Sequence, residues 1–221
     1  MPSITKKFIA MLSITLLLLW NLNFWGYFSA LRNVTILKQN ASPVPVDLFV
    51  MSKCPDAIFC ESLFAQVMQR VGSKAKIDLN FIGTINNAEP KYGVTCKHGE
   101  SECLGNIHEL CAKKISPESY FGFALCLNKN PSTIGKSDQA LTKCLVASNI
   151  PLAQFRTCVS EEGRQLLKDS VSYTKSMQMK TSCTILINKQ NKCIHDGTWK
   201  NCDNGYTEDD FVRQIEEAYQ N

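Results

Sequence analysis

The eleven cysteines of this 221-residue chain constrain its fold more than any other feature. None of them occurs in the first 50 residues. Cytosolic enzymes seldom carry so many thiols, whereas disulfides form and persist in the secretory pathway. The sequence therefore predicts a domain that folds in an oxidising compartment, and the odd count predicts at least one thiol without an intramolecular partner. The cysteines are Cys54, Cys60, Cys96, Cys103, Cys111, Cys126, Cys144, Cys158, Cys183, Cys193 and Cys202.

The N-terminal segment agrees with that compartment. Residues 8–31 carry no charge and follow two lysines, and about 20 apolar residues are enough to cross a bilayer. Cleavage after Ala30 would place the bulky Phe28 where a signal peptide needs a small residue. We therefore expect residues 1–31 to be the uncleaved signal-anchor of a type II, single-pass membrane protein. A cleaved signal peptide, which would give a secreted protein, is the alternative.

Residues 32–43 are expected to form a lumenal linker, because they contain two N-glycosylation sequons, at Asn33 and Asn40. The remaining residues, 44–221, are expected to form one domain. The sequence leaves open whether its compartment is the endoplasmic reticulum, the Golgi, a vacuole or lysosome, or the extracellular space. The net charge is +4 without a basic stripe, which argues against nucleic acid as a partner.

Hydrophobic periodicity predicts an α/β domain. Val46, Leu48 and Val50 alternate with other residues as in a strand, apolar residues of 63–71 recur at helical spacing, and residues 77–81 alternate again. A strand, a helix and a strand in this order form a βαβ unit with a parallel sheet. After it, residues 84–110 are polar and cysteine-rich and are expected to be irregular, and residues 117–177 are helical in pattern.

The C-terminal part predicts a hairpin and a last helix. Residues 181–188 and 192–197 are expected to be strands joined by a turn, and Thr207 with Asp210 is expected to cap the final helix. The whole order is that of a thioredoxin-like fold, in which a helical, disulfide-rich insertion of about 84–178 separates the βαβ and ββα halves.

Cys54 is the first candidate catalytic residue, because it stands where the first strand is expected to turn into a helix. A thiolate at a helix N-terminus is stabilised by unpaired amide N–H groups and by the helix dipole. Pro55 suits the first helical position, and Lys53 adds positive potential. This position predicts that Cys54 is a nucleophile.

Cys60 is the expected resolving thiol, but it lies six residues after Cys54. In a regular helix this spacing gives a rotation of about 240° and a rise of about 9 Å, too far for a disulfide. A redox pair therefore requires residues 55–59 to loop out and the helix to begin near Cys60 or Glu61. The alternatives are a structural, loop-closing bond between the two cysteines, or other partners for both.

A second cluster, residues 96–111, reads CKHGESECLGNIHELC. Its thiols and imidazoles could bind zinc, although the spacing fits no common zinc module and an oxidising lumen favours disulfides. We therefore expect no metal, and expect the cysteines to hold an otherwise weakly apolar segment in place. The zinc alternative would use Cys96, His98, Cys103, His108 and Cys111.

The same stretch resembles the signature C-Q-H-G-x-x-E-C-x-x-N-x-x-x-x-C of the gamma-interferon-inducible lysosomal thiol reductase family. The one departure is Lys97 in place of glutamine, and the SKCPDA sequence around Cys54 resembles a fungal-type branch of the family. The resemblance extends over residues 44–220. The matching positions are Cys96, His98, Gly99, Glu102, Cys103, Asn106 and Cys111.

The resemblance implies a thioredoxin-like domain that reduces protein disulfides in an acidic compartment. By this analogy Cys54 attacks the substrate disulfide and Cys60 resolves the mixed disulfide, although five residues separate them here instead of two. No cofactor is expected, because the dithiol itself carries the electrons, and the expected partners are disulfide-bonded proteins. The candidates for structural disulfides are Cys126, Cys144 and Cys158 in the insert, and Cys193 and Cys202 after it.

Thioredoxin-like folds place a cis-proline before the third strand, where this chain has Ser182 and Cys183. Cys183 is therefore a candidate third redox or substrate-facing thiol. The alternative is a structural cysteine, either packed beside the strand or bonded to Cys193 or Cys202. His98, His108 and His195 are expected to be structural, with proton transfer as an alternative for His195.

Two other functions remain open. One is a non-enzymatic, disulfide-stabilised lumenal binding module, and the other is a chaperone that holds clients by mixed disulfides and tolerates loss of Cys60. An enzyme needs Cys54 exposed and readily ionised, whereas a structural module would bury it.

Overall fold

The computed structural model describes residues 42–220. The expected signal-anchor (1–31) and both sequons, at Asn33 and Asn40, lie outside these residues. Within residues 42–220, no helix is both long enough and apolar enough to span a bilayer.

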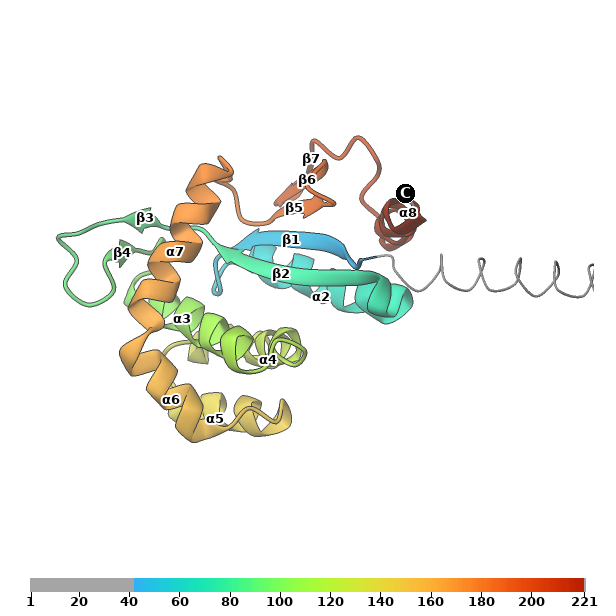
Figure 1. Cartoon of the computed structure of the whole chain (residues 1–221). Coiled ribbons are helices and arrows are strands. Elements are labelled where there is room, and N and C mark those ends of the chain that lie inside the picture. Colours follow the sequence, from blue (N-terminus) through green and yellow to red (C-terminus); the bar gives the residue numbers. More distant parts are fainter. Residues whose placement is uncertain (1–41, 221) are drawn as a thin grey trace, which may run out of the picture. The chain divides into compact units, whose positions relative to one another are not determined.

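A five-stranded sheet is the centre of the domain (Figure 1). The strand order is β2-β1-β5-β6-β7. β1 and β2 are parallel, and the other neighbours are antiparallel. The strands are β1 (Val44–Val50), β2 (Ala75–Phe81), β5 (Thr184–Ile187), β6 (Asn191–Asp196) and β7 (Thr198–Lys200).

The predicted βαβ unit is present. Every residue of β1 except Pro45 is buried, because strands at the centre of a sheet are covered on both faces. Helix α2 (Pro55–Val71) follows, with proline in its first turn, and ends at Gly72. Gly72 has a φ of 56°, in the left-handed region where glycine has no steric penalty. A short 3₁₀ turn, η1 (Gly72–Lys74), then leads into β2.

Residues 84–110 were expected to be irregular. This prediction is wrong from Glu100 onward, where a helix begins. A small ladder of β3 (Thr84–Ile85) and β4 (Val94–Thr95) precedes the helix α3 (Glu100–Ile115). Cys103, Ile107, Leu110 and Cys111 are buried on one face of α3, at the spacing of a helix. The polar side chains between them obscured this pattern.

The expected helical run follows α3. It consists of α4 (Tyr120–Leu127), the 3₁₀ turn η2 (Pro131–Thr133), α5 (Asp138–Ala147), α6 (Leu152–Glu161) and α7 (Gly163–Ser176). α5 and α6 lie farther from the sheet than α7, which crosses beside β2 (Figure 1).

The C-terminal half forms as predicted, with one addition. β5 and β6 are a hairpin, and Thr207 and Asp210 exchange hydrogen bonds at the start of α8 (Glu208–Gln220). The three-residue strand β7 was not predicted. α8 packs on α2 through Phe211 and Phe64, whose ring centroids are 5.0 Å apart. On β1, Phe49 stacks on Tyr173 of α7. The thioredoxin-like order with its helical insertion is therefore confirmed.

Candidate redox site

Cys54 is the N-cap residue of α2. Its amide donates a 2.9 Å hydrogen bond to the Met51 carbonyl, which makes the turn between β1 and α2. Its Sγ lies 3.8 Å from the Ser182 carbonyl oxygen and donates to it. The strand-to-helix junction thus holds this thiol beside the segment that enters β5. We expected an attacking thiol to be exposed, but Cys54 is only 6% exposed.

The expected loop between Cys54 and Cys60 does not form. α2 begins at Pro55 and continues through Cys60 without interruption, since proline at the first position and an acidic Asp56 in the first turn both favour this helix start. Cys60 is fully buried and unpaired, so neither the structural bond to Cys54 nor another disulfide partner is present. The two cysteines are separated by more than one helical turn.

Cys183 lies between these two thiols and β6. It immediately precedes β5, and its backbone exchanges two 3.0 Å hydrogen bonds with His195. The peptide bond before it, Ser182–Cys183, is cis. The Cys60 thiol lies beside the Cys183 thiol. Burial, this contact and the nearby groups of Cys60, Glu61 and Cys54 raise the pKa of Cys183 well above its usual value.

The other eight cysteines form four disulfides, Cys96–Cys103, Cys111–Cys158, Cys126–Cys144 and Cys193–Cys202. A structural bond from Cys183 to Cys193 or Cys202 is therefore wrong, because these two cysteines bond to each other. Cys183 is instead packed as a free, fully buried thiol. The zinc alternative is wrong as well, since Cys96, Cys103 and Cys111 are in disulfides and offer no thiolate.

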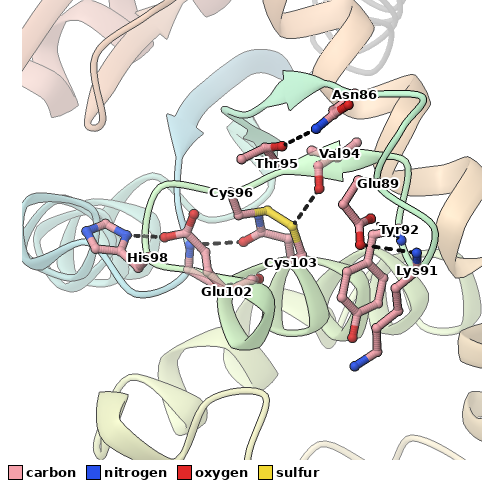
Figure 2. The surroundings of a disulfide bond; sticks show 12 residues. Asn86, Glu89, Lys91, Tyr92, Val94, Thr95, Cys96, His98, Glu102 and Cys103 are labelled. Atoms are coloured by element: carbon pink, nitrogen blue, oxygen red, sulfur yellow. Dashed lines mark hydrogen bonds and ion pairs between the residues drawn. A yellow bond between two sulfur atoms is a disulfide. The ribbon is translucent and has the colours of Figure 1, made fainter.

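The signature cluster encloses the Cys54 turn from one side. Cys103 Sγ lies against the Val94 carbonyl, and His98 pairs with the buried Glu102 (Figure 2). Asn106 accepts a 3.1 Å hydrogen bond from the Ser52 amide, and Ser52 Oγ donates to the Glu102 carbonyl at 3.3 Å. Asn106 and the backbone of Glu102 therefore support the turn that carries Cys54.

Two contacts of this turn were not predicted. Lys53 Nζ donates a 2.9 Å hydrogen bond to Ser101 Oγ in the first turn of α3. A Cβ on Gly105 would come within 2.6 Å of Ser52 Oγ, so glycine is needed for the close approach of α3. Only the position of Gly105 inside a cysteine-rich helix could have indicated this.

An aromatic cluster covers the other side of the site. His195 stacks on Phe59 of α2, with centroids 4.4 Å apart, and contacts Trp199 of β7 edge-on. His195 Nδ1 lies 2.8 Å from Asp56 Oδ1, and this oxygen accepts a hydrogen bond from the Gly197 amide. Phe59 remains 47% exposed. This arrangement attaches the β6–β7 turn to the first turn of α2.

A buried carboxyl pair, Glu61 and Glu109, lies behind the thiols and was not predicted. Burial raises the pKa of Glu61 to about 7, against the opposing effect of its hydrogen bond from Asn128. Burial and then the neighbouring Glu61 raise the pKa of Glu109 well above its usual value. Glu61 Oε1 and both carboxyl oxygens of Glu109 have no hydrogen-bond partner within residues 42–220. The position of Glu61 directly after Cys60 was the only signal in the sequence.

Replacing Glu61 with glutamine is expected to remove part of the pH dependence of stability. A carboxyl whose pKa rises on folding binds its proton more tightly in the folded state, so the free energy of unfolding falls as pH rises from the unfolded to the folded pKa. For Glu61 this window runs from 4.5 to about 7. Between pH 5 and 8 the free energy of unfolding of the wild type should fall by on the order of 3 kcal/mol relative to that of the variant.

Urea unfolding at both pH values measures this difference. Burial lowers the pKa of His108 to about 4, which favours the folded state at higher pH, but this contribution is common to both proteins and cancels. The matched control is Glu118→Gln, at an exposed position. An equal pH dependence in wild type and Glu61→Gln would contradict the prediction.

Solved structures that are similar to the domain share its fold. The oxidised BdbD from Bacillus subtilis has a TM-score of 0.55 and 15% identity, covering 83% of this chain and 91% of that one. The thiol-disulfide exchange protein alpha-DsbA2 from Wolbachia pipientis has a TM-score of 0.54 and 12% identity, covering 81% and 83%. The fold and the thiol cluster together define a thioredoxin-like protein with an inserted helical region.

The family can be stated more narrowly. Residues 45–148 match the family described as gamma interferon inducible lysosomal thiol reductase. A relative with that name from Carassius auratus is 24% identical over 145 residues, which are 64% of this chain and 57% of that protein. The chain thus spans less than two thirds of the length of its curated relative. The resemblance predicted from the signature is thus confirmed over the matched residues.

Proposed function

We propose that this protein is a lumenal thiol–disulfide oxidoreductase that reduces disulfides in protein substrates through Cys54. The observation that carries the proposal is the distribution of free thiols. Eight cysteines are paired, while Cys54, Cys60 and Cys183 are unpaired and gathered at the head of α2. The name of the matched family and the thiol-disulfide exchange named for one structural neighbour support the same chemistry.

In the first step the Cys54 thiolate attacks one sulfur of the substrate disulfide. A Cys54–substrate disulfide forms, and the other substrate sulfur leaves as a thiolate that takes a proton from water. Cys54 is the entry point among the three because Cys60 and Cys183 are both 0% exposed. A second thiol of the protein then attacks Cys54 Sγ, forms an intramolecular disulfide and releases the other substrate sulfur. The sequence-based candidate for this thiol is Cys60.

The compartment is part of the proposal. Four disulfides require an oxidising environment, which supports a place in the secretory pathway. Membrane anchoring through residues 1–31 and glycosylation at Asn33 and Asn40 stay predictions.

Capture of the mixed disulfide tests the proposal. The reduced full-length protein is mixed with a peptide that one intramolecular disulfide closes, quenched with acid, alkylated, and digested for mass spectrometry. We expect the peptide on Cys54 before any other cysteine, followed by the appearance of free peptide dithiol. If Cys54 is alkylated and carries no peptide at early times, the proposal is contradicted.

The burial of Cys54 favours a second candidate, the non-enzymatic binding module. In that case Cys54 should react with iodoacetamide no faster than Cys60 in the folded protein. The oxidoreductase requires the opposite order, so the alkylation rates of the two thiols separate the candidates.

A further inference from the structure

The geometry of α2 prevents Cys60 from resolving a mixed disulfide on Cys54 directly. The helix is continuous from Pro55, so the two residues are about 9 Å apart along its axis and about 240° apart around it. A disulfide requires Cα atoms within about 7 Å. Direct bonding would require the first turns of α2 to unwind, against Pro55 and the contacts of Asp56 with the β6–β7 turn.

Cys183 lies near both thiols without any such change in the helix. The Cys60 thiol lies close enough to the Cys183 thiol to raise the pKa of Cys183. The Cys54 sulfur lies 3.8 Å from the carbonyl oxygen of Ser182, which is the peptide oxygen directly before Cys183. Cys183 comes from a different part of the chain than α2, so the helical spacing that separates Cys54 from Cys60 does not apply to it.

Several contacts hold Cys183 in this place. Two backbone hydrogen bonds fix it to His195 of β6, and Ser182 Oγ accepts a 3.2 Å hydrogen bond from the Met51 amide. The residue is therefore attached to β6 on one side and to the end of β1 on the other. Apart from Cys54, Cys60 and Cys183, every cysteine is in a disulfide and offers no free thiol.

We propose that Cys183 is an obligatory redox relay, which resolves the mixed disulfide on Cys54 and passes the bond to Cys60. The proposal rests on the function proposed above. In the resolving step Cys183 Sγ attacks Cys54 Sγ, the Cys54–Cys183 disulfide forms, and the substrate sulfur leaves and takes the proton that Cys183 loses. The buried thiol therefore ionises only as the substrate departs.

In the last step Cys60 Sγ attacks Cys183 Sγ. The Cys60–Cys183 disulfide forms, the Cys60 proton goes to water, and Cys54 leaves as the thiolate that began the cycle. Overall the substrate disulfide is reduced to two thiols, and two cysteine thiols are oxidised to one disulfide. A small dithiol, acting as external reductant, would restore the starting state.

The test uses full-length protein with the disulfide-closed peptide in a single turnover, and compares two matched thiol-to-hydroxyl variants. In Cys183→Ser the peptide should remain on Cys54, with a lifetime about 100-fold longer than in wild type, because the intramolecular nucleophile is lost. In Cys60→Ser the peptide should leave at nearly the wild-type rate and a Cys54–Cys183 disulfide should accumulate.

Disulfide mapping of the wild type gives a result that does not depend on the folding of a variant. One equivalent of peptide should produce the Cys60–Cys183 bond and leave Cys54 free for alkylation. A Cys54–Cys60 bond with Cys183 alkylated, or release from Cys183→Ser at the wild-type rate, would overturn the relay and leave the proposed function intact. Absence of any peptide adduct on Cys54, including in Cys183→Ser, would overturn both.

Discussion

Replacing Cys54 with serine is expected to lower the rate of protein-disulfide reduction by about 10³-fold or more, because removal of a covalent nucleophile leaves only the contribution of binding. The effect is expected to be this large because the other two free thiols are fully buried and cannot start the exchange. Serine has nearly the same size as cysteine, and Cys54 makes only one weak side-chain hydrogen bond. The variant should therefore fold normally.

The measurement is the initial rate of reduction of a fluorogenic protein disulfide in the presence of a dithiol, with the unfolding midpoint recorded for the same samples. Cys54→Ala should show the same loss, since neither a hydroxyl nor a methyl group can form the mixed disulfide. Val146→Ala, at a surface position 72% exposed on α5, serves as the control with unchanged rate. A Cys54→Ser variant with more than about a tenth of the wild-type rate would show that the chemistry begins elsewhere.

The sequence predicted the fold well because the strands and most helices have strong local patterns. The βαβ unit, the hairpin and the Thr207 cap depend on neighbours within a few residues, so periodicity and capping rules detect them. Helix α3 was missed because buried polar residues, Glu102, Asn106 and Glu109, occupy positions where an apolar pattern was sought. Their burial depends on tertiary partners that a single sequence does not show.

The redox site shows the same difference between features set by local sequence and features set by tertiary contacts. Cys54 could be placed from the sequence because a strand-to-helix junction is a local feature. The contact of Cys183 with Cys60 joins residues 123 positions apart, and it follows from the pairing of β5 with β1. The sequence allowed either a loop or a helix after Cys54, and the structure contains the helix. Because the helix keeps Cys60 away from Cys54, the proposed resolving step needs Cys183, which the sequence had offered only as a possible third thiol.

Loss of the Cys111–Cys158 disulfide is expected to have the largest effect on stability among the four. This bond joins α3, which supports the Cys54 turn, to α6, and it closes the longest loop, with a sequence separation of 47. A disulfide restricts the unfolded chain more when the closed loop is longer. The double variant Cys111→Ala/Cys158→Ala should lose about 4 kcal/mol of unfolding free energy.

The comparison is with Cys193→Ala/Cys202→Ala, whose bond closes a loop with a separation of only 9. The chain-entropy estimate for that loop is about 2.6 kcal/mol, so the two double variants should differ by about 1.5 kcal/mol in urea unfolding at constant m-value. The first variant should also loosen the Ser52–Asn106 contact, because α3 loses its covalent link to the outer helices. Faster alkylation of Cys54 in that variant, with an unchanged rate in the second, would show that the disulfide-bonded insertion controls access to the redox site. Equal alkylation rates in both variants would mean that the insertion stabilises the domain without affecting the thiols.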